Sequence, residues 1–523
     1  MLTSRFTWCC HRRVAAPGRG ARGCSGAGAR ALVLALALLT ACAPAIKPVD
    51  APLEAMPAPV GEPLWQELAA LREGAAAGDW YHLLNTGYEA LEWRLRAIDS
   101  ASREIELQTF LWKNDRVGTL LSERILAAAD RGVTVRILID DSFLAQADPQ
   151  IRRLARHPAI EYRIYNPVAN RAGGTLTRQL ANLSAFERID HRMHNKVLII
   201  DQQVAIVGGR NLADEYFGYH RQHNFRDMEV LAGGEVVAQL VEGFYSYWNN
   251  PWSIPADQLL AASGEVAEPG TQALQWPLET AELRRDFWRA MAQRAVPGRG
   301  TLLLDNPPLD PADPRQAPSQ LATALLASLE RAERDALLVS AYFVPTPRLQ
   351  QRIVELLQRG IDVRVLTNSL DSNNHVTAQS AYDHHRRTLL LADADLFEMR
   401  ADARDRQRYM VTPMQESLLG LHAKVLLLDD GTTFIGSANL DPRSLRLNTE
   451  MGLLIESREL NAQLRRYLQP DLAPHNAWRV QLDDRGRLRW RSGSELRDSE
   501  PAASFVLRLE SWLFGLMPIE DEM

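Results

Sequence analysis

One spacing of histidine, lysine and aspartate occurs twice in this chain, as two copies of His-x-Lys-x4-Asp separated by 228 residues. The copies consist of His194, Lys196, Asp201, His422, Lys424 and Asp429. The chain has only four lysines, and two of them lie in these copies. Chance would give two such copies in a chain of this composition with a probability on the order of 10⁻⁵. The repeat therefore has a chemical or structural purpose, and its residue types suit phosphoryl transfer.

The residues around each copy predict a strand that aims both side chains at one place. Histidine and lysine two residues apart on a strand point to the same face, and four apolar residues follow each lysine. Seven residues after each aspartate begins Gly-x-x-Asn, which ends at Asn211 and Asn439. Glycine permits close backbone approach, and asparagine supplies an amide donor. One histidine could attack the phosphorus of a phosphodiester and the other could protonate the departing alcohol, while cations and amides hold the remaining oxygens.

These motifs resemble the signature of the phospholipase D superfamily, in which two His-x-Lys-x4-Asp motifs are each followed by Gly-Gly/Ser-x-Asn. The resemblance implies metal-independent phosphatidyl transfer through a phosphohistidine, with His194 as nucleophile and His422 as general acid and then base. It also implies phosphate binding by Lys196, Lys424, Asn211 and Asn439. In the superfamily a downstream acid orients each histidine, and the candidates here are Glu229 and Glu450. A carboxylate on the second imidazole nitrogen would fix the tautomer and raise the basicity of the ring.

Other charged residues of the motifs have less direct expected roles. Asp201 and Asp429 belong to the catalytic motifs, and we expect them to hold neighbouring backbone or side chains rather than to touch the substrate. Arg210 precedes Asn211 and is expected to pair with Asp214 or Glu215 rather than with the phosphate.

Five segments resemble more narrowly the bacterial cardiolipin synthases of the C type. They are residues 192–196, 208–217, 340–345, 366–370 and 441–444. The resemblance implies that a phosphatidyl group moves from one phospholipid to the head-group glycerol of phosphatidylglycerol, which gives cardiolipin. The donor would be phosphatidylglycerol, with phosphatidylethanolamine as a further possibility.

Three alternative functions fit part of the pattern. A phospholipase D that passes the phosphatidyl group to water would need the same residues, because acceptor choice depends on how water is excluded from the intermediate. A nuclease is disfavoured by the acidic charge of the chain. A catalytically dead lipid-binding scaffold is disfavoured because both sets of histidine, lysine and asparagine are intact.

Charge and cysteine usage exclude several classes of partner. The formal net charge is -6, and the first 41 residues carry six arginines and no acid, so the remainder carries -12. An acidic surface gains nothing from counterion release, so nucleic acid is not an expected partner. All four cysteines lie within the first 42 residues. No P-loop, dinucleotide fingerprint or metal-ligand cluster stands out, so we expect neither cofactor nor metal.

The elements that must position these residues predict an α/β fold. Residues 131–140 recur as residues 359–368 at the same 228-residue offset, which indicates two halves of one architecture. Strands are expected at 104–111 and 336–343, and helices at 118–130 and 349–358. We expect two pseudo-symmetric phospholipase D-like α/β domains, each with a buried mixed sheet flanked by helices. The expected divisions are a first half (66–255), a connecting segment (256–330), a second half (331–470) and a C-terminal hairpin with an amphipathic helix (471–523).

The N-terminal residues predict export and lipid modification. Residues 1–41 are rich in arginine and end in an apolar run at 31–39, which is too short to span a bilayer and is typical of a signal peptide. Leu39-Thr-Ala-Cys42 resembles a lipobox, so Cys42 would be the lipidated first mature residue. Residues 42–65 contain six prolines and predict an extended tether. We expect a lipoprotein that faces the periplasm, in the outer membrane. The sequence does not identify a protein partner.

Overall fold

The computed structural model describes residues 48–49, 52–53, 64–66, 68, 78–142, 148–168, 186–260, 264–267 and 274–502. The predicted signal peptide at 1–41, Cys42 and the predicted C-terminal helix at 505–517 lie outside these residues. The described residues all belong to one compact unit that begins at Ile46. No helix in this part of the chain is long and apolar enough to cross a membrane.

The first half forms a mixed sheet. Its strands pair in the order β9 (Ser253–Pro255), β4 (Ile160–Tyr165), β3 (Thr134–Asp140), β2 (Glu104–Thr109), β5 (Val197–Ile200), β6 (Val204–Gly208), β8 (Glu229–Gly233) and β1 (Asp79–Leu84). Strands β2, β3 and β4 run parallel, and the other pairs are antiparallel. The parallel strands are joined by helices, because a parallel connection must cross over one face of the sheet.

The second half repeats this order. Its strands pair as β18 (Ala477–Leu482), β13 (Asp395–Met399), β12 (Asp362–Asn368), β11 (Asp335–Ser340), β15 (Lys424–Leu428), β16 (Thr432–Gly436), β17 (Met451–Glu456) and β10 (Val296–Leu304). The hairpin partners β19 (Leu488–Ser492) and β20 (Glu495–Arg497) extend the outer edge. The prediction of two pseudo-symmetric α/β domains with mixed sheets is therefore confirmed.

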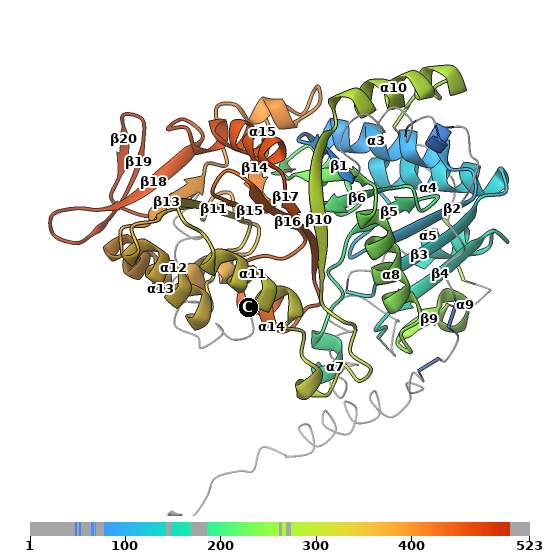
Figure 1. The fold of residues 1–523 in the computed structure, drawn as a ribbon, viewed down its shortest axis with the longest axis horizontal. Coiled ribbons are helices and arrows are strands. Elements are labelled where there is room, and N and C mark those ends of the chain that lie inside the picture. The colour runs from blue at the N-terminus through green and yellow to red at the C-terminus, as the bar shows by residue number, and fades with distance from the viewer. Residues whose placement is uncertain are drawn as a thin grey trace, which may run out of the picture. The chain divides into compact units, whose positions relative to one another are not determined.

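Strands β1 and β10 pair antiparallel and join the two sheets into one (Figure 1). Strand β10 lies in the predicted connecting segment 256–330, so the expected start of the second half at residue 331 is too late. Pro297, Gly298 and Gly300 near the start of β10 are typical of a turn and concealed the strand. Strand β18 likewise completes the second sheet, although it lies in the predicted C-terminal region.

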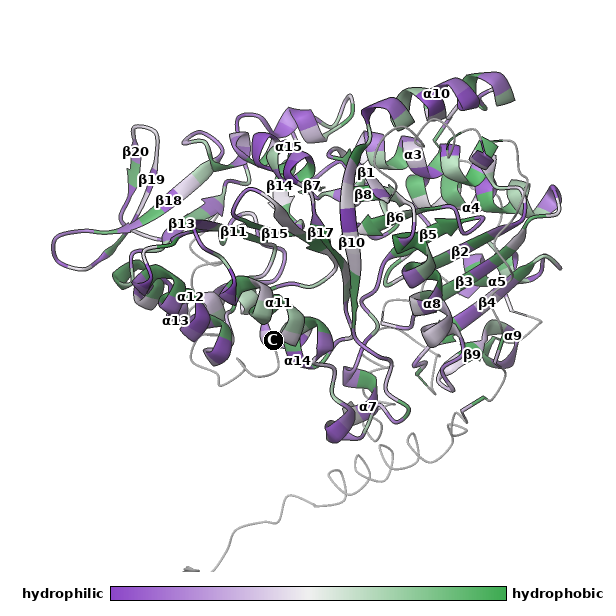
Figure 2. Cartoon of the chain, in the orientation of Figure 1, coloured by the Kyte–Doolittle hydropathy of each residue, from purple (hydrophilic) through white to green (hydrophobic). Residues whose placement is uncertain are grey.

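Helices cover the sheets and divide the interior into three hydrophobic cores. The outer core of the first half lies under α3 (Gly87–Ser100) and α4 (Arg116–Asp130), and that of the second half under α11 (Gln320–Glu330) and α12 (Pro347–Gln358). The central core contains side chains of both sheets together with α8 (Val236–Trp248) and α15 (Arg458–Leu468). Figure 2 shows the apolar strands inside and polar helix surfaces outside. The shared central core fixes the two halves against each other, which a site built from both halves requires.

The proline-rich N-terminal segment contacts the body at several points. The amide of Val49 donates to the carbonyl of Pro251 (2.8 Å), and the amide of Leu53 donates to Oδ1 of Asn249 (2.7 Å). Further on, the buried indole of Trp65 packs edge to face on Trp288 with ring centroids 5.5 Å apart. The expectation of a free tether over 42–65 is therefore wrong where the structure describes it. Apolar side chains between the prolines pack on the body of the protein, which the high proline content did not predict.

Candidate active site

His194 is held by the second half of the chain. It lies just before strand β5, and its amide donates to the carbonyl of Thr449 (2.8 Å). This backbone contact brings the imidazole next to Glu450, the residue before β17. There Nδ1 donates to Oε2 of Glu450 (2.9 Å). Ser437 Oγ donates to the same carboxylate at 2.5 Å. Nδ1 is thereby committed to Glu450, and Nε2 is the nitrogen left for chemistry.

His422 is held by the first half in the same way. Strand β14 (Leu418–Leu421) runs parallel to β7 (His223–Arg226), and the amide of His422 donates to the carbonyl of Arg226 (2.8 Å). Nδ1 of His422 donates to Oδ2 of Asp227 at 2.7 Å. Each half therefore supplies the carboxylate that orients the other half's histidine.

Asp227, and not Glu229, is the acid on His422, which corrects the sequence prediction. In the first half the end of β6 pairs with Glu229, and in the second half the end of β16 pairs with Gly452. Glu450 lies two residues before Gly452, just as Asp227 lies two residues before Glu229. The two acids are thus equivalent by strand register. The assignment of Glu450 as an orienting acid agrees with the structure, except that it serves His194.

Glu229 has a structural role instead. Its carboxylate accepts a bidentate pair of hydrogen bonds from Arg94 (2.6 and 2.7 Å) and a third from Arg210 (3.2 Å), and all three side chains are buried. Arg210 also donates to the backbone carbonyls of Tyr216 and Asp227. The expected pairing of Arg210 with Asp214 or Glu215 is therefore wrong.

Replacing Glu229 by glutamine should destabilise the protein without removing a reacting group. Two buried guanidinium groups would lose their anion, which costs about 3 kcal/mol of the free energy of unfolding. Urea titration of Glu229→Gln and the wild type measures this loss, and an unchanged midpoint would contradict the structural role.

Both lysines lie in the same electrostatic environment as both imidazoles. Burial lowers the pKa of His194 and of His422 well below the ordinary value, and Lys196 and Lys424 lower each of them further. Burial also lowers the pKa of Lys196 to about 7 and that of Lys424 to about 8. Each ammonium donates to the backbone carbonyl of its own motif's histidine. The structure therefore brings the predicted histidines and lysines into one site, where a bound anion would be stabilised.

The two asparagines have spare hydrogen-bonding capacity. In the part of the chain that the structure describes, Oδ1 of Asn211 and Oδ1 of Asn439 are buried without a protein partner. Nδ2 of Asn211 donates to the hydroxyl of Tyr216 (2.9 Å). A half-turn of this amide would let the hydroxyl donate instead and would free Nδ2 for a ligand oxygen.

Asp201 and Asp429 lie at the far ends of the motif strands and hold backbone. Asp201 accepts from the amides of Ser102, Arg103 and Glu104 at 2.9–3.0 Å, and from the indole of Trp65 at 2.9 Å. Asp429 accepts from the amides of residues 333–335. They tie the start of β2 and β11 to the motif strands, as expected, and they do not contact either imidazole.

Aromatic rings that the sequence did not predict line the site, one beside His194 and two beside His422. Phe110 meets His194 edge to face at 4.9 Å, and its ring lies 5.3 Å from the ammonium of Lys196. On the other side, Tyr216 meets His422 at 4.9 Å and Phe225 lies 5.2 Å from it. Tyr216 lies within the segment 208–217 that follows the first motif, and Phe110 lies in the predicted strand 104–111, but nothing in their spacing indicates the contact.

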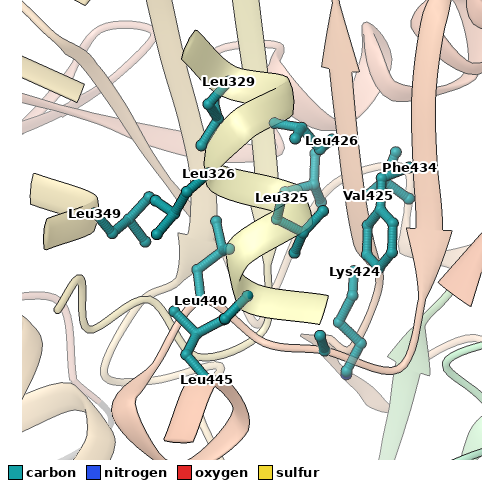
Figure 3. A pocket seen from close by; sticks show the side chains of 13 residues that line it. Leu325, Leu326, Leu329, Leu349, Lys424, Val425, Leu426, Phe434, Leu440 and Leu445 are labelled. Carbon is teal, nitrogen blue, oxygen red and sulfur yellow. The ribbon is translucent and has the colours of Figure 1, made fainter. Parts of the chain in front are cut away.

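A small apolar cavity of about 20 Å³ lies beneath the site, between α11 and strands β15 and β16 (Figure 3). Leu325, Leu329, Val425 and Phe434 line it together with the stem of Lys424. A space of this size holds about one water molecule. Its lining explains the lowered pKa of Lys424, since the aliphatic stem crosses an apolar layer before the ammonium reaches the site.

Comparison with known proteins agrees with this geometry. The family model described as "Cardiolipin synthase, PLD-like domain" matches residues 95–248 and 325–472. The chain belongs to this family. Members are enzymes of the phospholipase D superfamily, and the two matched ranges correspond to the two halves described above.

Several relatives and one solved structure resemble this family member over most of its length. It is 32% identical over 462 residues to cardiolipin synthase C of Escherichia coli (strain K12), which covers 84% of this chain and 94% of that protein. It is 25% identical over 396 residues to cardiolipin synthase B of the same strain, which covers 74% and 79%. The crystal structure of phosphatidylserine synthase from Haemophilus influenzae Rd KW20 has the same fold, with a TM-score of 0.50 and 16% identity over 79% of this chain and 92% of that chain.

Proposed function

We propose that this enzyme makes cardiolipin by transferring a phosphatidyl group to phosphatidylglycerol through a phosphohistidine. The observation that carries the proposal is the reciprocal orientation of the two imidazoles. Glu450 holds Nδ1 of His194 and Asp227 holds Nδ1 of His422, which leaves one Nε2 for attack and one for proton transfer. Similarity to cardiolipin synthases B and C supports the choice of substrate.

The first step forms the covalent intermediate. Nε2 of His194 donates its lone pair to the phosphorus of a phospholipid, and the bond from phosphorus to the head-group oxygen breaks. His422 enters this step as the imidazolium, with Nδ1–H on Asp227, and its Nε2–H gives that oxygen a proton. A phosphatidylglycerol donor therefore releases glycerol. Lys196 and Lys424 stabilise the negative charge on the non-bridging oxygens.

The second step uses the same groups in reverse. Nε2 of His422 now removes the proton from a head-group hydroxyl of a second phosphatidylglycerol. The hydroxyl oxygen attacks phosphorus, the phosphorus–nitrogen bond breaks, and His194 is restored with cardiolipin as product. Attack by water instead would give phosphatidic acid, so exclusion of water decides between synthase and hydrolase.

The ratio of kcat to KM should be bell-shaped in pH with its maximum at about 7. Burial raises the pKa of Glu450 to about 7, so at lower pH the carboxylate is protonated and His194 loses its acceptor. Lys196 and Lys424 lose their protons as the pH rises through about 7 and about 8. Initial rates across the neutral range test this, with Glu450→Gln as the variant that should lack the acidic limb. A profile that is flat across this range would contradict these assignments.

Product analysis decides between the candidate functions. Purified enzyme should convert phosphatidylglycerol vesicles to cardiolipin and glycerol in equal amounts. Added phosphatidylethanolamine tests the second donor, because its use would release ethanolamine. Phosphatidic acid as the main product would establish a hydrolase, and the absence of any product would leave the lipid-binding scaffold.

We further propose that Cys42 carries a lipid and that the protein is anchored in the cell envelope, facing the periplasm. The support is the run 31–39 followed by Leu39-Thr-Ala-Cys42. Growth with a radioactive fatty acid should label the wild type and not Cys42→Ser. Label retained in Cys42→Ser would contradict the assignment.

A further inference from the structure

We infer that the surface formed by Arg188, Trp252 and Leu309 is where the protein meets an anionic phospholipid bilayer. The inference rests on the proposed function, because a substrate held in a bilayer must be met at its surface. We call these three residues the Trp252 surface.

The Trp252 surface combines an apolar tip, an indole and a cation. Leu309 is 69% exposed, and its carbonyl accepts a hydrogen bond from the indole of Trp252 at 3.0 Å. The guanidinium of Arg188 lies 4.7 Å from the centre of the Trp252 ring and donates to the carbonyl of Pro167 at 2.9 Å. Tryptophan is enriched at membrane interfaces, and the positive charge of Arg188, whose guanidinium also donates to Oδ1 of Asn166, attracts an anionic lipid surface.

The Trp252 surface is connected to the catalytic groups by short stretches of chain. Arg188 lies in α7 (Phe186–Asp190), which ends four residues before His194. Arg443 of the second half donates to Oδ1 of Asp190, the last residue of α7, at 2.9 Å. This ion pair connects the two halves at the rim of the catalytic site. The loop that carries Leu309 begins at Asp305, whose amide donates to the carbonyl of Glu450 at 3.0 Å. A bilayer at this surface would therefore face the rim of the catalytic site.

The segment around Val49 and Leu53 lies next to the Trp252 surface. Val49 and Leu53 hydrogen-bond to Pro251 and Asn249, immediately before Trp252. Cys42 precedes Val49 by seven residues, which span at most about 25 Å when fully extended. An anchor at Cys42 would hold the Trp252 surface within that distance of the lipid. Together with the proposed lipidation of Cys42, the position of the docked segment supports a bilayer as the occupant.

Fluorescence quenching tests which surface enters the lipid. The full chain, with Cys9, Cys10 and Cys24 replaced by serine and Cys42 kept as the proposed lipidation site, receives one labelled cysteine at position 309 or, as the control, at position 391. Leu391 is 72% exposed and lies at the end of α13 (Val376–Leu391), so the two positions are matched in exposure. On phosphatidylglycerol vesicles with brominated acyl chains, we expect stronger quenching at 309 than at 391. Equal quenching, or stronger quenching at 391, would overturn the inference.

Activity on two physical forms of the substrate provides a second readout. Leu309→Glu should lower the rate on vesicles about tenfold, because one leucine side chain is lost from the lipid contact. On short-chain phosphatidylglycerol below its micellar concentration the rate should be unchanged. Leu391→Glu should match the wild type on both forms. Equal loss on both forms, or no loss on vesicles, would contradict the inference. A wild type inactive on both would refute the proposed function, while the quenching result would still decide the docking surface.

Discussion

Replacing either His194 or His422 by alanine should lower turnover by about 10⁵-fold or more, close to the loss seen when the nucleophile or base of a catalytic unit is removed. The expected losses are similar because each imidazole acts in both steps. His194 forms and then breaks the bond to phosphorus, and His422 gives and then takes a proton. Release of glycerol from phosphatidylglycerol, followed by a sensitive coupled assay, measures both variants.

The stability of these variants separates chemistry from folding. Each imidazole lies at the edge of the site, outside the three hydrophobic cores, so both alanine variants should unfold cooperatively and retain the wild-type circular dichroism. A variant that keeps more than about one per cent of wild-type turnover would contradict a direct role for that histidine.

Replacing Asp227 by asparagine should lower kcat by about 10³–10⁴, the second largest effect expected. Oδ1 of Asp227 already accepts from the amide of Met228 at 2.8 Å, and Oδ2 accepts from Nδ1 of His422 at 2.7 Å. An asparagine must keep its oxygen toward Met228, so its amide nitrogen would face Nδ1. Two donors cannot pair, so Nδ1 would lose its proton and Nε2 would hold it. His422 would then be in the wrong tautomer to accept a proton from the incoming alcohol.

Glu450→Gln is the matched comparison on the other side of the site. Both carboxylate oxygens of Glu450 lie within 3.0 Å of Nδ1 of His194, and Ser437 can either donate or accept. A glutamine can therefore keep its oxygen toward Nδ1, and we expect a loss of only about 10–100-fold. Steady-state kinetics with equal losses for the two variants would contradict the tautomer argument.

Much of the fold followed from the repeat, because the 228-residue offset fixes equivalent strands in both halves. The parts of the fold that the sequence did not predict lie where local residue preferences conflict with long-range contacts. Strand β10 begins with Val-Pro-Gly, which is typical of a turn, yet its partners β1 and β17 hold it extended. The segment around Val49 and Leu53 has the composition of a tether, yet hydrogen bonds to Pro251 and Asn249 and the packing of Leu53 on the central core dock it.

The site was predictable in its reacting residues and less so in the residues that position them. His194, Lys196, His422 and Lys424 were singled out by their repeated spacing, and the resemblance to the phospholipase D superfamily implied their roles. The acid on His422 could not be assigned in this way, because Asp227 and Glu229 are two residues apart at the start of β8 and both are acidic. Strand register separates them, and a search for the residue equivalent to Glu450 by pairing would have found Asp227.

In this account one imidazole bonds to phosphorus and the other transfers a proton. A substrate whose leaving group needs no proton tests this division directly, because it should bypass only the second role. With a phosphatidyl ester of p-nitrophenol, rapid mixing should show a burst of nitrophenolate in His422→Ala, together with a phosphatidyl adduct on His194 in the mass spectrum. His194→Ala should show neither the burst nor the adduct. A burst in His194→Ala, or an adduct on His422, would contradict the account.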